Sequence, residues 1–409
     1  NLECDVKLFA DDTCVFSVVN DPILTANALN NDLSMIQQWA YQWKMSFNPD
    51  LSKQAQEVLF SRKRVQVNHP DLYFNGSVVQ KTTTQKHLGV FLDAKLTFKD
   101  HLNHIFDKTT NRIGMLRKLR FFVPRQSLIT IYKSFIRSLL DYADVVYDQP
   151  NNVSFSEKIE SIQYNAALAI TGGIRGSSKI KIYQELGLEY LSSRRWFRRL
   201  CLFFRIFNYK SPSYLYDLIP HPHHDINTRN QSQIPSLYCR TESFVNSFLP
   251  TCIKEWNKLD SSVKQSASIV QFRNSILKTI RPVQNNIFDI CDNEGIKLLT
   301  RLRLGLSHLH KHKFDHGFRD TVSPMCSCNT EIESVTHYIL RCPIFNQQRI
   351  HLMNEINKIV PNLLLENECI FLSTLLYGKS EFDNDLNSKI LLLTLEFIHS
   401  SKRFDMPLF

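Results

Sequence analysis

Apolar residues alternate with polar ones on both sides of two adjacent aspartates near the start of the chain. The alternating positions are Val6, Leu8 and Ala10 before the pair, and Cys14, Phe16 and Val18 after it. A period of two residues is typical of β-strands, so the sequence predicts a tight hairpin with Asp11 and Asp12 at its tip. Two turn-forming aspartates also suit an ordinary solvated turn, and the pattern alone leaves both interpretations open.

The next segment changes to the period of a helix. Between Thr25 and Met45, apolar side chains recur at helical spacing, at Leu29, Leu33, Ile36, Ala40 and Trp43. This pattern predicts an amphipathic helix that lies on a sheet. Asn48-Pro49 then ends the helix, because proline cannot continue it.

Short strands and a second hairpin are predicted after this helix. The strands are expected at 57–60 and 87–93. A hairpin is expected over 72–79, because Asn75-Gly76 supplies the two positive φ angles of a type I′ turn. From 98 to 210 the pattern is helical, with little glycine or proline inside it.

One helix of this region separates arginines from apolar residues. At about 100° per residue, one arc of the segment 194–207 holds Arg194, Arg195, Arg198, Arg199 and Arg205. The opposite arc holds Trp196, Phe197, Leu200, Phe203 and Phe207. Because no carboxylate lies among the arginines, we expect them to contact phosphate. A solvated face and a helix lying on anionic membrane are the alternatives.

Composition and charge favour a polyanionic partner. The 409 residues are 43% hydrophobic, which suits two or three globular domains. The net charge of +10 fits binding to nucleic acid. The longest apolar run, Ile390 to Leu395, is too short to span a bilayer, and no signal peptide is visible. We therefore expect an intracellular protein, nuclear or cytoplasmic, that is not secreted and has no membrane partner.

A cysteine cluster towards the C-terminal end predicts a metal site. Ten cysteines are too sparse for a disulfide scaffold, so clustered ones indicate metal. The cluster is the array C-x-C-x8-H-x4-C, formed by Cys326, Cys328, His337 and Cys342. It matches a closed, structural zinc site that leaves no ligand position for water. Alternative ligands, or members of a basic surface, are His308, His310, His312 and His316.

Several motifs follow the order found in one polymerase family. They are Phe9-Ala10-Asp11-Asp12, Trp39-Ala-Tyr-Gln-Trp43, Phe47-Asn48-Pro49, Val58-Leu-Phe-Ser-Arg62-Lys63, Phe74-Asn-Gly76, Lys86-His-Leu-Gly-Val90 and the CCHC array. In these motifs the chain resembles reverse transcriptases of non-LTR retrotransposons, close to the jockey and CR1-like groups. The array departs from the spacing of the retroviral zinc knuckle, so the base-stacking role of that knuckle is not carried over.

The resemblance implies roles for individual residues. Asp11 and Asp12 are expected to hold two Mg²⁺ ions, as the active-site pair does in such polymerases. Lys53 is expected near the incoming deoxynucleoside triphosphate, with a solvated loop lysine as the alternative, and Leu88 and Gly89 are expected in the primer grip. Two-metal transfer also needs a third carboxylate, which the family supplies upstream of this chain together with the fingers. The chain is therefore expected to be a fragment that is inactive alone.

Together these features predict an α+β protein with four parts. They are a partial reverse transcriptase palm of hairpins plus helix (1–95), a helical thumb (96–215), a linker and helical region of unknown role (216–300), and a small zinc-binding C-terminal domain (301–409). The implied function is RNA-directed DNA polymerisation in the full-length protein, with template RNA and primer DNA as partners. The alternative is a non-catalytic relic that binds nucleic acid through the thumb and zinc unit.

Overall fold

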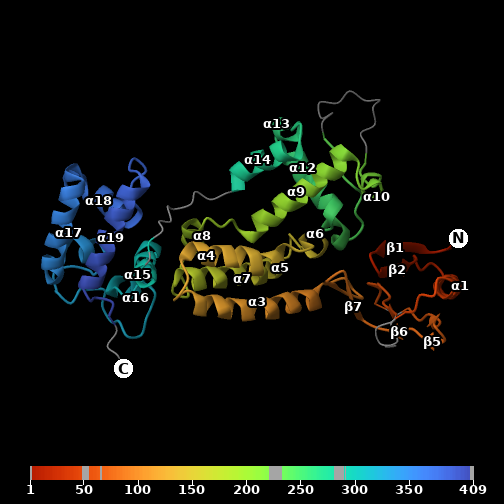
Figure 1. Ribbon diagram of the computed structural model, residues 1–409. Coiled ribbons are helices and arrows are strands. Elements are labelled where there is room, and N and C mark those ends of the chain that lie inside the picture. The colour runs from red at the N-terminus through yellow and green to blue at the C-terminus, as the bar shows by residue number, and fades with distance from the viewer. Residues whose placement is uncertain are drawn as a thin grey trace. The chain divides into compact units, whose positions relative to one another are not determined.

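The computed structural model describes residues 2–47, 55–64, 67–220, 233–280, 290 and 292–405. The chain divides into two compact units, Asn1–Ile105 and Phe106–Phe409, and each is described by itself. Among the described residues, most of the regular structure is helical, and the paired strands form small two-stranded sheets in the first unit (Figure 1). The prediction of an α+β protein is confirmed in this coarse form, a mostly helical protein with small hairpins near its N-terminal end.

The predicted hairpin around the aspartates is confirmed. Strands β1 (Asp5–Phe9) and β2 (Asp12–Phe16) pair antiparallel, with Phe9 opposite Asp12. The two-residue turn is therefore Ala10-Asp11, and Ala10 takes the positive φ of 53° that such a turn requires. Asp11 lies in the turn, whereas Asp12 is the first residue of the second strand.

Helix α1 (Pro22–Gln42) begins three residues before the expected start. Asp21 accepts hydrogen bonds from the backbone N–H groups of Ile23 and Leu24, and Pro22 suits the first helical position. The buried face packs on the hairpin that contains Leu72 and Phe74, as the pattern predicted. Trp43 was wrongly included in that face, because α1 ends before it and the indole is 67% exposed.

The remaining strands of the first unit are very short. Their bounds are β3 (Gln56–Glu57), β4 (Tyr73–Phe74), β5 (Ser77–Val78), β6 (Gln80–Lys81), β7 (Thr84–His87) and β8 (Val90–Asp93). Strands β4 and β5 form the expected hairpin around Asn75 and Gly76, whose φ angles are 52° and 74°. The single strand expected at 87–93 is wrong: β7 and β8 pair antiparallel, and Leu88-Gly89 is the turn between them.

The expected helical region forms the first part of the second unit. After α3 (Lys99–Leu119), whose first turns belong to the first unit, come α4 (Arg125–Ile131), the π-helix η1 (Tyr132–Arg137), α5 (Ser138–Asp141), α6 (Asp144–Tyr147), α7 (Val153–Thr171), α8 (Lys179–Leu186), α9 (Leu191–Tyr209) and α10 (Ser213–Tyr216). Helix α7 packs against α4, α8 and α9. Asn152 caps its start, and Gly172 ends it with a φ of 67°.

Helix α9 also packs against a following group of helices. Their bounds are α11 (Glu242–Val245), α12 (Phe248–Lys258), α13 (Ser261–Lys264) and α14 (Ile269–Ile280). The core between α9, α12 and α14 is aromatic, because Phe203, Phe204, Trp256 and Phe272 pack together there. Helix α9 is therefore covered on two sides, by α7 and by this group.

A further core lies in the C-terminal part of the same unit. Its elements are α15 (Asn293–Leu304), α16 (His310–Asp315), η2 (His337–Arg341), η3 (Pro343–Phe345), α17 (Asn346–Ile359), η4 (Pro361–Leu365), α18 (Glu368–Tyr377) and α19 (Asn384–Ser400). The expected boundary at residue 300 falls inside α15. None of the helices in the described ranges is both long and apolar enough to cross a membrane.

Candidate metal centre and nucleic-acid interface

The structure brings Cys326, Cys328, His337 and Cys342 together. Their ligand atoms all lie within 4.8 Å of one another. The Sγ atoms of Cys326 and Cys342 are 3.6 Å apart, and Sγ of Cys328 is 3.2 Å from Nε2 of His337. Tetrahedral zinc with ordinary bond lengths separates its ligand atoms by about 3.6 to 3.8 Å. The Cys326–Cys342 distance matches this separation, and the Cys328–His337 distance is shorter than it. Four ligand atoms gathered this closely could hold a four-coordinate zinc ion and would fill all four positions.

A tight turn aims the first two thiols. Met325 pairs with Ile332 across the turn, and the backbone N–H of Cys326 donates to the carbonyl of Glu331 at 2.9 Å. The backbone N–H of Asn329 donates a hydrogen bond to the carbonyl of Cys326 at 2.9 Å. Because the chain folds back within these few residues, Cys326 and Cys328 reach the same point.

A π-helical turn aims the other two ligands. In an α-helix, residues five apart point about 140° away from each other. The segment His337–Arg341 is instead π-helical, and the N–H of Cys342 donates to the carbonyl of His337 at 2.7 Å. This hydrogen bond joins two residues that are five positions apart, so His337 and Cys342 lie on the same side of the π-helical turn. Pro343 follows directly. The π-helical turn therefore explains why four residues separate His337 from Cys342, which the sequence pattern alone did not explain.

Neighbouring side chains hold the ligands in place. Oε2 of Glu331 lies 3.3 Å from Nδ1 of His337, which leaves Nε2 facing the cysteines. A carboxylate behind a histidine ligand is the usual arrangement in zinc proteins. The hydroxyl of Thr330 lies 3.0 Å from Sγ of Cys328. Arg349 donates to the carbonyl of Cys342.

The thiols differ in how readily they ionise without a cation. Burial raises the pKa of the Cys326 thiol to about 12 and also raises the pKa of Cys342. Burial works to raise the pKa of Cys328, but hydrogen bonds with Thr330, Cys326 and His337 together lower it to about 6. A bound divalent cation would favour the thiolate form of all three.

The alternative histidine ligands lie outside the quartet. Nδ1 of His310 contacts the carbonyl oxygen of Met325 at 2.7 Å. His312 is buried, with Nδ1 2.9 Å from the hydroxyl of Ser307, and burial lowers its pKa to about 4. The interpretation of this stretch as a basic surface is therefore wrong for His312, which belongs to the interior.

The residues expected at the polymerase site are only partly placed by the structure. Asp11 and Asp12 are both exposed. Within the described ranges, no group of three or more metal-ligating side chains includes either aspartate. Leu88 and Gly89 form a hairpin turn, with φ angles of 46° and 83°. Lys53 lies outside the described residues.

The expected arginine face of α9 is wrong in its geometry. Arg195 and Arg199 are 4% and 7% exposed, and most of the arginines are paired with carboxylates. The pairs are Arg194 with Asp141 and Glu189 (2.7 and 2.8 Å), Arg195 with Asp148 (3.2 Å), Arg198 with Asp144 (2.7 Å), and Arg199 with Asp148. Arg205 is exposed. Phosphate contact by these five arginines stays a prediction. The arginines do not form one exposed, unpaired face of α9 that could make this contact.

The carboxylates that meet α9 were missed in the sequence. Asp141, Asp144 and Asp148 recur at spacings of three and four residues, about 50 positions before the arginines. That spacing is helical and would have indicated an acidic stripe, but not that α9 faces it. Although burial works against its charge, hydrogen bonds to Asp141 and Glu189 raise the pKa of Arg194. Burial lowers the pKa of Arg199, which remains a cation at neutral pH.

Comparison with known proteins relates part of the chain to retroelement polymerases. The RNA-directed DNA polymerase from mobile element jockey of Drosophila melanogaster is 27% identical over 172 residues, which is 41% of this chain and 18% of that protein. The jockey polymerase of Drosophila funebris is 30% identical over 145 residues, 35% of this chain and 15% of that protein. The probable RNA-directed DNA polymerase from transposon X-element of Drosophila melanogaster is 27% identical over 167 residues, 40% of this chain and 18% of that protein.

These matches cover less than a fifth of each relative's length. No protein-family model matches the chain. No solved structure matches it either. Over part of its length, the chain is distantly related to the RNA-directed DNA polymerases of non-LTR retrotransposons.

Proposed function

We propose that the chain is the C-terminal part of an RNA-directed DNA polymerase of a non-LTR retrotransposon. The observation that carries this proposal is the partial similarity to the jockey and X-element polymerases. In this proposal residues 1–95 contribute part of the palm, the helical region 96–215 forms the thumb, and the CCHC quartet binds a structural zinc ion. Template RNA, primer DNA and deoxynucleoside triphosphates are the partners of the full-length, intracellular protein.

Asp11 and Asp12 would hold magnesium in the complete polymerase. Their carboxylate oxygens are ligands that Mg²⁺ prefers, and the hairpin turn leaves both exposed. Divalent cations in such a site activate the primer hydroxyl and stabilise the leaving pyrophosphate. The fit is partial, because no third carboxylate joins them among the residues that the structure describes. Leu88 and Gly89 would belong to the primer grip, and Lys53 to the nucleotide site.

The alternative function is nucleic-acid binding without catalysis. A relic that only binds nucleic acid needs no third metal ligand, and it would use the same helices and zinc unit. The two functions differ in the longer open reading frame. An intact third-aspartate strand and fingers upstream support the polymerase, and a start codon close to Asn1 supports the relic.

Binding to a labelled RNA–DNA primer-template tests the nucleic-acid function that both candidates share. We expect fluorescence anisotropy to show affinity that falls as salt rises, because cations that contact phosphate displace condensed counterions. Replacing the exposed Arg205 by glutamine should reduce the slope of log affinity against log salt by about 0.9, as expected for one lost phosphate contact.

The matched control is Lys358→Gln, which removes the same charge from an exposed, ion-paired lysine of α17. It should leave the slope unchanged. Absence of binding at low salt would refute the nucleic-acid function. An unchanged salt slope in Arg205→Gln would show only that Arg205 does not contact phosphate.

A further inference from the structure

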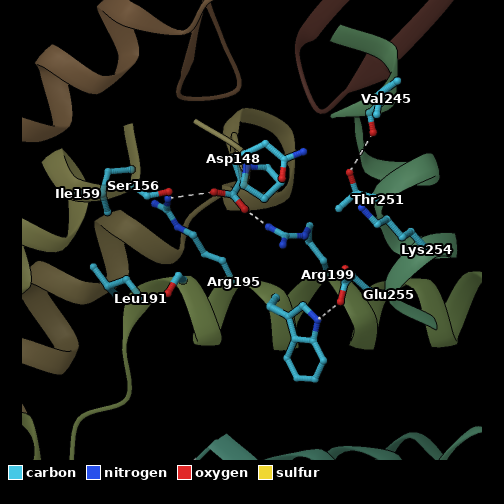
Figure 2. Close-up of a pocket in the computed structure, with 14 residues that line it drawn as sticks. Asp148, Ser156, Ile159, Leu191, Arg195, Arg199, Val245, Thr251, Lys254 and Glu255 are labelled. Atoms are coloured by element: carbon cyan, nitrogen blue, oxygen red, sulfur yellow. Dashed lines mark hydrogen bonds and ion pairs between the residues drawn. The ribbon is translucent and has the colours of Figure 1, made fainter. Parts of the chain in front are cut away.

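A pocket in the second unit gathers the two most buried arginines of α9. It lies between the start of α7, the first half of α9 and helix α12, and its volume is about 260 Å³. Figure 2 shows Arg195 and Arg199 rising from one helix towards Asp148, with Ser156 beside Arg195. A site needs only about 15 Å³ to hold one water molecule, so this arginine pocket has room for a larger ligand.

The charges that line the arginine pocket leave an excess of positive charge. Arg195 and Arg199 share the single carboxylate of Asp148. Lys254 and Glu255, on α12, also line the pocket, and the carboxylate of Glu255 accepts hydrogen bonds from Trp196 and Lys258. Three cations therefore face two anions, and both anions already accept hydrogen bonds.

Arg195 is held rigidly and keeps one donor without an acceptor. Its guanidinium lies over the rings of Tyr147 and Phe155, at 5.4 and 5.7 Å from their centres. Nη1 is 3.2 Å from Asp148, whereas Nε is buried and has no hydrogen-bond partner. A buried unsatisfied donor costs free energy, so an acceptor that reached Nε would be stabilised.

The rest of the lining suits an oxyanion. The first turns of α7 and α9 contribute Ser156 and Ser192, and helix N-termini favour negative charge. Thr251 adds another hydroxyl from α12. Hydroxyl groups from α7, α9 and α12 and two guanidinium groups of α9 thus line one pocket, and guanidinium groups form strong, often bidentate hydrogen bonds with phosphate.

We propose that the arginine pocket binds a phosphoryl group through Arg195 and Arg199, with the exposed Lys254 as a further cation. The phosphate contact expected of α9 would then take place in the arginine pocket and not along an exposed stripe. The proposal rests on the proposed function for the physiological source of the phosphate. A terminal phosphate of a nucleic-acid strand and free inorganic phosphate share the chemistry that the pocket recognises.

Titration calorimetry of the 409-residue protein with inorganic phosphate tests the pocket directly. We expect saturable binding that Ser192→Phe weakens by about tenfold or more, because the ring fills the pocket from an exposed position. Lys254→Gln should weaken binding severalfold. Lys278→Gln, an equal charge loss on α14 outside the pocket, should leave it unchanged. These variants avoid the buried arginines, whose replacement would disturb folding.

A second titration identifies the source of the phosphoryl group. A short oligonucleotide with a 5′-phosphate should bind more tightly than the same strand with a 5′-hydroxyl, and Ser192→Phe should abolish the difference. Equal binding of both strands, with phosphate still bound, assigns the pocket to free phosphate. Binding of primer-template without any saturable, Ser192-dependent phosphate binding overturns the pocket and leaves the proposed function standing. Phosphate binding without primer-template binding overturns the proposed function alone.

Discussion

Glu185 joins helices that are far apart in the sequence. The carboxylate is 1% exposed and lies 2.8 Å from Nη1 of Arg125 and 2.6 Å from Nη1 of Arg303. Arg125 begins α4, and Arg303 lies near the end of α15. One buried anion thus holds two cations that would otherwise lie close together in the interior.

Replacing Glu185 by glutamine should destabilise the second unit strongly. Removing one partner of a buried ion pair costs about 3 to 5 kcal/mol, because the remaining charges stay buried without compensation. Urea denaturation followed by circular dichroism measures the effect. Glu396→Gln is the control, since the side chain of Glu396 is 59% exposed and lies 3.5 Å from the similarly exposed His351. It should change the free energy of unfolding by at most about 0.5 kcal/mol.

The buried carboxylate of Glu333 should make the free energy of unfolding depend on pH. Its carboxylate is 1% exposed and accepts hydrogen bonds from Arg403 at 2.6 and 2.7 Å. Burial opposes the charge, but the arginine and the backbone N–H of His310 lower the pKa of Glu333 below its usual 4.5. A carboxylate whose pKa is lowered on folding stabilises the protein above its unfolded-state pKa. That stabilisation is lost as the pH falls through the folded-state value.

The gap in unfolding free energy between the natural chain and Glu333→Gln should therefore depend on pH. We expect it to be widest between pH 5 and 7, at about 3 to 5 kcal/mol, and to narrow below pH 4.5. Denaturation of both proteins at each pH measures the gap, and other acid-sensitive groups cancel in the difference. A gap that stays constant down to pH 3 would show that the charge of Glu333 contributes nothing.

At the scale of elements, the zinc quartet is part of a larger core than its sequence indicated. A short segment around Cys326–Cys342 buries little apolar surface alone, which predicts that it melts without metal. In the structure, Tyr338 and Ile339 of η2 are fully buried beside residues of α17 and α19. We therefore expect metal loss to weaken the whole C-terminal core, and not only the segment itself.

Elemental analysis should find one zinc ion per chain, bound by Cys326, Cys328, His337 and Cys342. Chelation should lower the melting temperature of the C-terminal core and leave α9, α12 and α14 folded, because these three helices share a separate core. Cys328→Ser should reduce zinc content below about 0.2 per chain, since one of four ligands is lost. Cys369→Ser, at an exposed cysteine outside the quartet, is the control. Full zinc content in Cys328→Ser would reassign the quartet to ordinary buried thiols.

At the scale of the whole molecule, the proposed polymerase chemistry needs more metal ligands than the described residues bring together. Asp11 and Asp12 lie on one hairpin, and within the described ranges no third carboxylate completes a metal site with them. We expect the 409-residue chain to extend no primer on an RNA template with Mg²⁺ or Mn²⁺. Incorporation of labelled nucleotide measures this. Template-dependent synthesis that disappears in Asp11→Ala would contradict the prediction and show that the pair suffices.

The features that the sequence alone determined depend on interactions between residues close together in the chain. The hairpins at Ala10-Asp11 and Asn75-Gly76, the main helices and the zinc quartet depend on residues close together in the chain, so spacing and turn preference reveal them. The sequence missed the hairpin at Leu88-Gly89, where leucine takes an unfavoured positive φ of 46°. Apolar spacing also could not tell that Trp43 lies beyond the end of α1.

Only the tertiary structure decided the role of the arginines in α9. Their partners Asp141, Asp144 and Asp148 lie about 50 residues earlier, and helical periodicity contains no information about which distant element will face a charge. The same holds for Glu185, whose partner Arg303 is 118 residues away. Long-range pairing follows from how helices pack, because burial in a shared core brings opposite charges together that the sequence keeps apart.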